Sequence, residues 1–429
     1  MQLSRRAFLR LAGKAGLATP FIFGASSCAL GTAGRFDTDT GLSLGYVTGD
    51  ATPDGAVVWL RAAPDSSVSL QYGKDPDFAS STSVAAIRTA SESDFTIKVT
   101  LRGLDPATVY YYRAVVAGKK PGPGARFMTA PAPDAAAVVK FCFGGDTREG
   151  YRPFIIMEAI RAKRPDFFIH LGDTIYADRG FIASELSQFW SKYRTNRDDP
   201  PSQRLFSETS VYAIWDDHEV RNNYEAGHPL APAGQQAFLD YWPVRRDAGE
   251  PNRIYRSFRW GKALEVFLLD GRQYREHAKG TMLGSRQKEW LLDGLARSSA
   301  MFKIIATPVP FYGEGRDRWE GFPQERADVM EWIEEKKITG VVFLSADLHY
   351  AAVARLPGRL GLKEIVTGPL AAQVNLFGIG YSRNVEFFFN ETFNYGLITI
   401  DPKLRPPQLL LEILDENNRS LYQTRIDAV

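Results

Sequence analysis

Cysteine and histidine are scarce in this sequence, and its charges nearly cancel. The chain of 429 residues has two cysteines and five histidines. If a leader is removed beyond Cys28, Cys142 is the only thiol left, which excludes an intramolecular disulfide framework. Five histidines also leave little imidazole for a metal site. Because 52 Lys and Arg nearly balance 50 Asp and Glu, we expect no specific nucleic-acid binding.

Long hydrophobic runs are lacking as well. The N-terminal SRRAFLR is followed by LAGKAGLATPFIFGA, which Lys14 and Pro20 interrupt and which is too weak to span a bilayer permanently. This pattern is similar to a twin-arginine signal, so we expect residues 1–34 to direct export by the twin-arginine translocase to the periplasm, the cell surface or the medium. An ordinary Sec signal is the alternative. Cys28 is a candidate lipid anchor, although Ala25 stands where lipoboxes prefer leucine.

Residues 40–131 show short apolar segments at regular spacing, separated by turn signals. The segments are LSLGYVTG, AVVWLRA, SVSLQYG, FTIKVTL, VYYYRAVVAG and GARFMTA. This pattern predicts a β-sandwich, and GLDPATVYYYRA resembles the late strands of fibronectin type III-like domains. We expect Tyr110, Tyr111 and Tyr112 to pack rather than to bind a ligand. The Ala- and Pro-rich APAPDAAA then reads as a linker.

From residue 136 to residue 429 the pattern changes to apolar runs that alternate with helical stretches. VVKFCF, DFFIHLG, VYAIW, ALEVFLLD, FKIIAT, GVVFLSA and EIVTG are the strand candidates. Such runs are typical of the buried strands of an α/β domain. YGLITID and PQLLLEILDENNRSLYQTRI predict closing antiparallel strands with a turn at DENN.

Polar clusters stand at the ends of several buried runs: GGDTR, LGDTIYAD, WDDHEVRNN, LDGRQYR and SADLHY. Strand ends are where open α/β sheets build ligand sites. Asp146 and Asp173 are separated by nearly the ~30 residues of one strand–helix–strand unit, so both can reach one crevice. A single Asp often caps a helix or a turn, but five such clusters favour a functional site.

These motifs, in this order, resemble the calcineurin-like metallophosphoesterases, and most closely the PhoD-like alkaline phosphatase family. PDFFIHLGDTIYAD, WDDHEVRNN, LDGRQYR, TMLGSRQKEWL and LSADLHY carry the resemblance. It implies an α/β/β/α metallophosphoesterase sandwich behind the fibronectin type III-like domain. It also implies hydrolysis of phosphate monoesters or diesters by a metal-bound hydroxide.

The resemblance implies two metals and their ligands. Asp173 would bridge the metals, because a carboxylate has two oxygens and such metals lie about 3.5–4 Å apart. The full ligand set would be Asp146, Asp173, Tyr176, Asp217, Asp347 and His349. His170, in contrast, is expected to be a packed core histidine.

The ligand types indicate which metals to expect. A phenolate ligand such as Tyr176 requires a strongly polarising ion, which favours Fe³⁺. The second metal would be bound by Asp173, Asp217 and Asp347, and a ligand set of oxygens suits Ca²⁺. The resemblance also implies iron and calcium, with Zn²⁺ or Mn²⁺ as alternatives. Relatives often place a cysteine ligand at the position of Asp146. That difference speaks against a thiolate-bound iron, and we expect Cys142 to be a buried apolar residue.

The remaining candidates would act on the substrate. His218 would protonate the leaving group or bind a phosphoryl oxygen, unless it is a structural partner of Glu219. Candidate phosphate-binding residues are Arg148, Asn222, Arg272 and Tyr274, with solvated surface positions or a turn as the alternatives.

The sequence therefore predicts an exported metal-dependent phosphoesterase. One alternative is a phospholipase D-like phosphodiesterase that acts on phospholipid. Another is an exported binding protein without catalytic activity, whose metal site has decayed. Retention of all the predicted ligands argues against decay.

Overall fold

The computed structural model describes residues 34–313, 315–377 and 384–428. The predicted export leader and Cys28 lie outside the described residues. Within the part of the chain that is described, no helix combines the length and the apolar character needed to cross a membrane.

The N-terminal quarter of the chain is built from strands, as the sequence predicts. They are β1 (Leu42–Thr52), β2 (Gly55–Ala62), β3 (Ser67–Gly73), β4 (Thr82–Ser83), β5 (Ile87–Arg88), β6 (Thr96–Arg102), β7 (Val109–Val116) and β8 (Ala125–Met128). Every second residue of β7 is buried, because side chains of a strand alternate between its two faces. Tyr110 and Tyr112 accordingly lie in the core, which confirms their packing role.

The rest of the chain alternates strands and helices. The strands are β9 (Val139–Gly144), β10 (Phe167–His170), β11 (Ser210–Ala213), β12 (Arg256–Trp260), β13 (Leu264–Leu268), β14 (Phe302–Ala306), β15 (Val341–Ser345), β16 (Ala351–Arg355), β17 (Lys363–Val366), β18 (Val385–Phe389), β19 (Asn394–Asp401), β20 (Gln408–Asp415) and β21 (Ser420–Asp427). The helices are α2 (Ile156–Ala162), α3 (Leu186–Arg197), α4 (Pro200–Glu208), α5 (Ala231–Tyr241), α6 (Gly284–Arg297) and α7 (Pro323–Glu335). The closing antiparallel strands are confirmed as β19, β20 and β21, whereas β12, β16 and β18 were not predicted.

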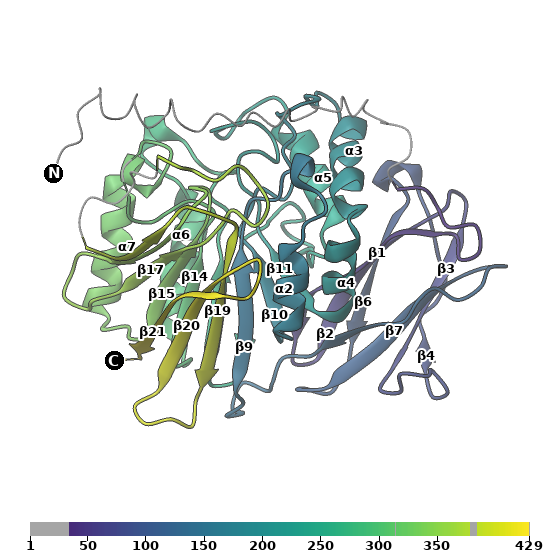
Figure 1. Ribbon diagram of the computed structural model, residues 1–429, viewed down its shortest axis with the longest axis horizontal. Helices are drawn as coiled ribbons and strands as arrows, with labels where there is room; N and C mark the ends of the chain where they lie inside the picture. Colours follow the sequence, from purple (N-terminus) through teal and green to yellow (C-terminus); the bar gives the residue numbers. More distant parts are fainter. Residues whose placement is uncertain (1–33, 314, 378–383, 429) are drawn as a thin grey trace, which may run out of the picture. The chain divides into compact units, whose positions relative to one another are not determined.

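Two mixed sheets pack face to face and form the α/β/β/α sandwich that the resemblance implies. The first has the order β21-β20-β19-β9-β10-β11-β1-β2-β6, and the second has the order β12-β13-β14-β15-β17-β16-β18. Apolar side chains of both sheets form one shared core. Helices α2 to α5 cover the outer face of β9 to β11, and α6 and α7 cover the second sheet, as Figure 1 shows.

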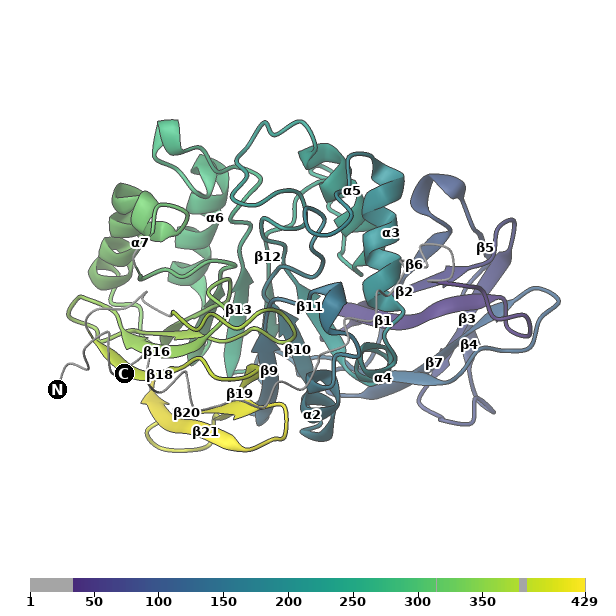
Figure 2. The ribbon, with the colours of Figure 1, turned by 45° about the horizontal axis from the view of Figure 1, so that its top comes forward.

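The N-terminal strands form a β-sandwich with a core of its own, and one of its two layers continues into the first large sheet. Strands β1, β2 and β6 belong to the nine-stranded sheet, while β3, β7 and β8 form most of a smaller sheet against them (Figure 2). Strand β1 pairs with β11 at Gly49 and Val211, and Trp59 donates from Nε1 to the carbonyl oxygen of Asp240 at 2.7 Å. Pairing between strands far apart in the sequence leaves no local pattern, so the sequence analysis did not predict that β1 pairs with β11.

Gly49 is required at this junction because the chains approach closely. A Cβ atom there would lie 2.5 Å from Val211 O and 2.5 Å from Pro243 Cγ. We expect Gly49→Ala to lower the free energy of unfolding by about 1–3 kcal/mol through overpacking, measured by urea denaturation. Gly150→Ala is the control, since a Cβ at Gly150 meets nothing within 4 Å. Equal stability of the two variants would contradict the tight junction.

Candidate metal centre and active site

The candidate site lies where strands of both sheets end. Asp146 follows β9, Asp173 follows β10 and Asp217 follows β11, which are parallel neighbours in the first sheet. Asp347 and His349 follow β15 of the second sheet. Parallel strands that end at one level bring their following loops together, so residues far apart in sequence meet at a single edge.

The loops hold these side chains by unusual backbone conformations. Asp146, Asp173, Asp347 and His349 have φ values of 69°, 52°, 67° and 56°, in the left-handed region that residues other than glycine seldom adopt. Small neighbours permit this packing: a Cβ at Gly145 would lie 2.7 Å from the Cβ of Ala346, across the two sheets. Backbone strain of this kind concentrates at functional sites.

The acidic side chains form overlapping groups that fit metal ions. The groups are Asp146, Asp173 and His349; Asp173, Asp217 and His218; and Asp216, Asp217 and Asp347, with the ligand atoms of each group within 4.8 Å of one another. Asp146 Oδ2 and Asp217 Oδ1 are buried and have no hydrogen-bond partner among the described residues. Buried carboxylate oxygens without a donor are costly unless a cation is bound, so the donor set fits hard metal ions.

The electrostatics lead to the same conclusion. Burial, and then the neighbouring Asp347 and Asp217, raise the pKa of Asp146 well above its usual value. Burial and Asp217 likewise raise the pKa of Asp347 to about 6. These carboxyl groups resist ionising together because like charges repel at low dielectric. A bound cation would reverse that balance.

Tyr176 lies within this cluster. Its hydroxyl is 3.1 Å from His349 Nε2, and its ring stacks on that of His218 with centroids 4.4 Å apart. Burial and the charge of Asp173 raise the pKa of the phenol well above its usual value. The phenol therefore becomes a phenolate only beside a strongly polarising cation.

His218 is oriented by Asp178. His218 Nδ1 lies 2.7 Å from Asp178 Oδ1, while its backbone N–H donates to Asp173 Oδ1. Burial opposes protonation of His218, but the hydrogen bond to Asp178 and the charge of Asp217 outweigh it and raise its pKa. The structural partner left open by the sequence is thus Asp178 and not Glu219.

Glu219 instead joins two of the ligand loops. Its carboxylate accepts from the backbone N–H of Asp173 at 3.2 Å, Thr174 at 2.5 Å and Asp216 at 2.9 Å, and from the Thr174 hydroxyl at 2.7 Å. Four donors satisfy a buried carboxylate without a cation. Glu219 is therefore a structural anchor for the loops after β10 and β11.

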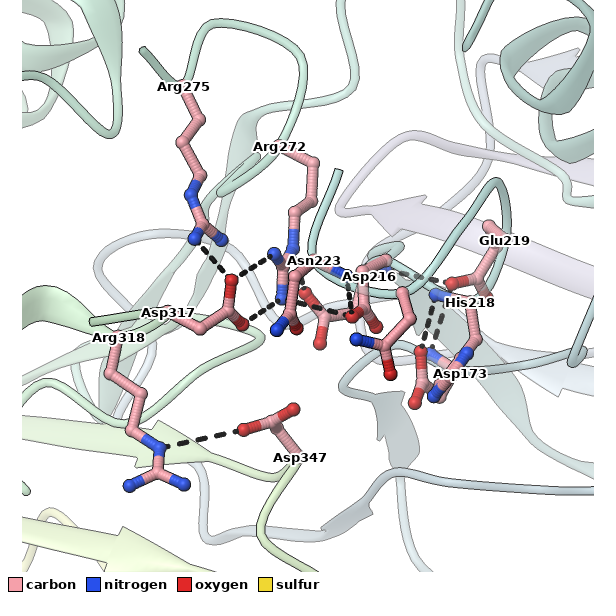
Figure 3. A network of polar contacts seen from close by, with 12 residues as sticks. Asp173, Asp216, His218, Glu219, Asn223, Arg272, Arg275, Asp317, Arg318 and Asp347 are labelled. Carbon is pink, nitrogen blue, oxygen red and sulfur yellow. Dashed lines mark hydrogen bonds and ion pairs between the residues drawn. The ribbon is translucent and has the colours of Figure 1, made fainter. Parts of the chain in front are cut away.

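A second network holds the loop after β14 (Figure 3). Arg272 is fully buried and contacts Asp216 at 2.5 Å, while its two terminal nitrogens each lie 3.1 Å from Asp317. Arg275 also binds Asp317. Arg318, next along the chain, lies 3.8 Å from Asp347.

A cavity of about 630 Å³ opens above the acidic groups. Four arginines line it, namely Arg148, Arg179, Arg316 and Arg318, together with Tyr176, His218, Asn223, Asp347 and His349. Leu376 and Phe377 also line it and are 71% and 87% exposed. The cavity thus combines cationic side chains, which suit a phosphate group, with an apolar rim.

Comparison with known proteins identifies the family. The family model of the PhoD-like phosphatase matches residues 141–386. The chain belongs to the PhoD-like phosphatase family. The model of the N-terminal domain of PhoD-like phosphatases matches residues 28–131. As a member of this family, the chain is a phosphoesterase.

Individual relatives agree with this assignment. Alkaline phosphatase D of Bacillus subtilis is 26% identical over 422 residues, covering 82% of this chain and 72% of the relative. The solved structure of PhoD matches with a TM-score of 0.79 at 21% identity, over 91% of this chain and 94% of that one. Purple acid phosphatase PPD1 of yellow lupin matches with a TM-score of 0.68 at 14% identity, over 89% of this chain and 74% of that one. The two structures share the metallophosphoesterase fold.

In this PhoD-like phosphatase, one of the four residues predicted to bind substrate lines the cavity and the other three do not. Arg148 lines the cavity. Asn222 does not, but its Oδ1 accepts from Arg179, which does. Arg272 lies beneath the site with Asp216 and Asp317.

Three further residues named in the sequence analysis also lie outside the lining. Tyr274 packs against Tyr255, with ring centroids 5.9 Å apart. His170 is buried and lies 3.3 Å from the Thr147 hydroxyl, and burial lowers its pKa to about 3, which confirms a packed neutral histidine. Cys142 is buried within β9 among core side chains, away from the acidic groups described above.

Sequence reasoning missed the groups that support the site. Asp178 and Glu219 lie inside motifs that were recognised, but their partners were not predictable from the motifs. Asp317, Arg316 and Arg318 lie in a loop with no periodic pattern, and only the fold brings it to the cavity.

Glu219→Gln tests the anchor between the two loops. The amide presents its own N–H donors to backbone N–H groups, so we expect the free energy of unfolding to fall by about 1–3 kcal/mol. Urea denaturation of the purified protein measures it. Glu289→Gln, at an exposed position of α6, is the control, and a Glu219 variant as stable as this control would show that the anchor contributes little.

Proposed function

We propose that this PhoD-like phosphatase is a metal-dependent hydrolase of phosphate monoesters or diesters. The observation that carries the proposal is the set of buried carboxylates whose oxygens lack donors, directly beneath an arginine-lined cavity. The residues proposed to hold the metals are Asp146, Asp173, Tyr176, Asp217, Asp347 and His349.

Metal ions in such sites supply an activated hydroxide and neutralise charge on the phosphoryl oxygens. The side chains of the protein would do the rest. Arg148 and Arg318, which both line the cavity, would donate to the phosphoryl oxygens. His218, held by Asp178, would donate a proton to the leaving oxygen.

Fe³⁺ and Ca²⁺ are the metals we propose. Tyr176 beside Asp146 and His349 supports Fe³⁺, because a phenolate favours a strongly polarising ion. Asp173, Asp217 and Asp347 supply oxygen ligands, which suit Ca²⁺. Zn²⁺ or Mn²⁺ is the alternative.

Activity on phospholipid is a second candidate function. It is supported by Leu376 and Phe377, which are exposed at the rim of the cavity and could contact an acyl chain. We also propose export by the twin-arginine translocase, for which SRRAFLR is the support.

Asp173→Asn tests the proposed metal centre. Asparagine removes the charge and one of the two oxygens that would bridge the metals, so we expect loss of at least one metal per chain and a fall in turnover of more than about 10³-fold. Elemental analysis for Fe, Ca, Zn and Mn, together with an assay on p-nitrophenyl phosphate, measures both effects.

Asp293→Asn is the matched control, because Asp293 is exposed on α6. Unchanged turnover of Asp173→Asn would overturn the two-metal proposal. Wild-type protein that holds no metal and hydrolyses no phosphate ester would favour the binding-protein alternative.

Asp178→Asn tests the role of His218 as a proton donor. Loss of the carboxylate charge lowers the pKa of His218, so less of it is protonated at neutral pH. We expect kcat to fall about 10-fold or more for an alkyl phosphate and much less for p-nitrophenyl phosphate, whose leaving group needs no proton. Equal losses on the two substrates would show that His218 does not protonate the leaving group.

A further inference from the structure

Helix α3 carries two buried polar residues on one face. Lys192 and Asn196 are four residues apart, so they lie one above the other on the helix. They are 6% and 8% exposed. Such positions on a packed helix are normally apolar, and buried polar groups require specific partners.

Both residues contact the same two loops, the loop after β9 that carries Asp146 and the loop after β10 that carries Asp173. Asn196 Nδ2 donates to Thr147 O at 2.8 Å and to Thr174 O at 2.8 Å. Because both partners are carbonyl oxygens, they settle which end of the amide carries the hydrogens.

Lys192 makes the corresponding link one turn earlier. Its Nζ donates to Glu149 Oε1 at 2.7 Å and to Arg179 O at 2.6 Å. Glu149 follows Arg148 in the first loop, and Arg179 follows Asp178 in the second. Each side chain of the pair therefore spans from one loop to the other.

The helix that carries this pair is itself held on other sides. Phe189 and Tyr193 lie in the apolar core beneath α3. Arg194 donates to Asp94, in the turn before β6, at 2.6 Å. Because α3 is held in place, side chains that project from it can fix the distance between the two loops.

Resting on the proposed metal centre, we infer that Lys192 and Asn196 are positioning residues that set the spacing of the loops bearing Asp146, Asp173 and Tyr176. Thr147 and Thr174 are the direct neighbours of Asp146 and Asp173. A displacement of either carbonyl therefore moves a ligand carboxylate. Groups that orient metal ligands from behind affect metal affinity as well as activity.

The test compares Asn196→Leu and Lys192→Met, which keep much of the side-chain volume but remove the donors. The readout is the chelator concentration that removes half of the native metal, followed by elemental analysis of the purified full-length chain. We expect each variant to lose metal at a chelator concentration about 10–100-fold lower than wild type. Lys192→Arg, which keeps a charged donor, should restore most of the retention.

Trp332→Phe is the matched control, because Trp332 donates from α7 to Leu292 O of α6 at 3.0 Å, outside the candidate site. It should lower Tm without changing metal retention. Metal retention in the Asn196 and Lys192 variants equal to that of the control would overturn the inference. If Asn196→Leu does not fold, Asn196→Ala and Lys192→Met give the same decision.

This outcome is distinguishable from failure of the proposed function. If Asp173→Asn keeps all metal and activity, the metal centre itself is misplaced. If Asp173→Asn loses metal while the Lys192 and Asn196 variants keep it, only the positioning role fails.

Discussion

The concentration of buried negative charge is the constraint on which the rest of this structure depends. Asp146, Asp173, Asp217 and Asp347 belong to overlapping groups whose ligand atoms lie within 4.8 Å of one another, and the first three are buried. Burying several ionised carboxylates costs more free energy than a small domain has to spare, unless cations or donors compensate. The buried carboxylates therefore lower the stability of the folded protein, and contacts from the surrounding fold must hold their loops in place.

Different side chains around the site compensate different carboxylates. Arg272 neutralises Asp216 and Asp217 from beneath, and also fixes the loop of Asp317. Glu219 is satisfied by backbone donors and needs no cation. Among the proposed ligands, Asp146 Oδ2 and Asp217 Oδ1 are buried oxygens without a donor in the described part of the chain, and the neighbouring Asp216 Oδ2 is a third. Helix α3 and the strand pairing at Gly49 connect this arrangement to the N-terminal strands.

The fold class and most strands were predictable because they depend on local patterns. Apolar runs marked β9, β10, β11 and β15, and the Asp residues that follow them marked the edge at which a site forms. Short strands such as β12 and β16 were not predicted, because five residues that include charged ones show too little hydrophobic periodicity. The sequence also did not predict that β1, β2 and β6 share a sheet with β9 to β11. That pairing joins residues far apart in the sequence and depends on the close approach of the chains at Gly49.

The sequence by itself determined which residue types stand at the strand ends, because each motif is local and its chemistry belongs to its side chains. It therefore pointed to a phosphoesterase with Asp146, Asp173 and Asp217 at its centre. Only the tertiary structure decided the partners: Asp178 for His218, Asp317 for Arg272, and α3 for the two ligand loops. The reason is physical, since an isolated Arg or Asp has the same sequence signature whether it faces solvent, substrate or another charge. Its role is set by what the fold places within hydrogen-bonding distance.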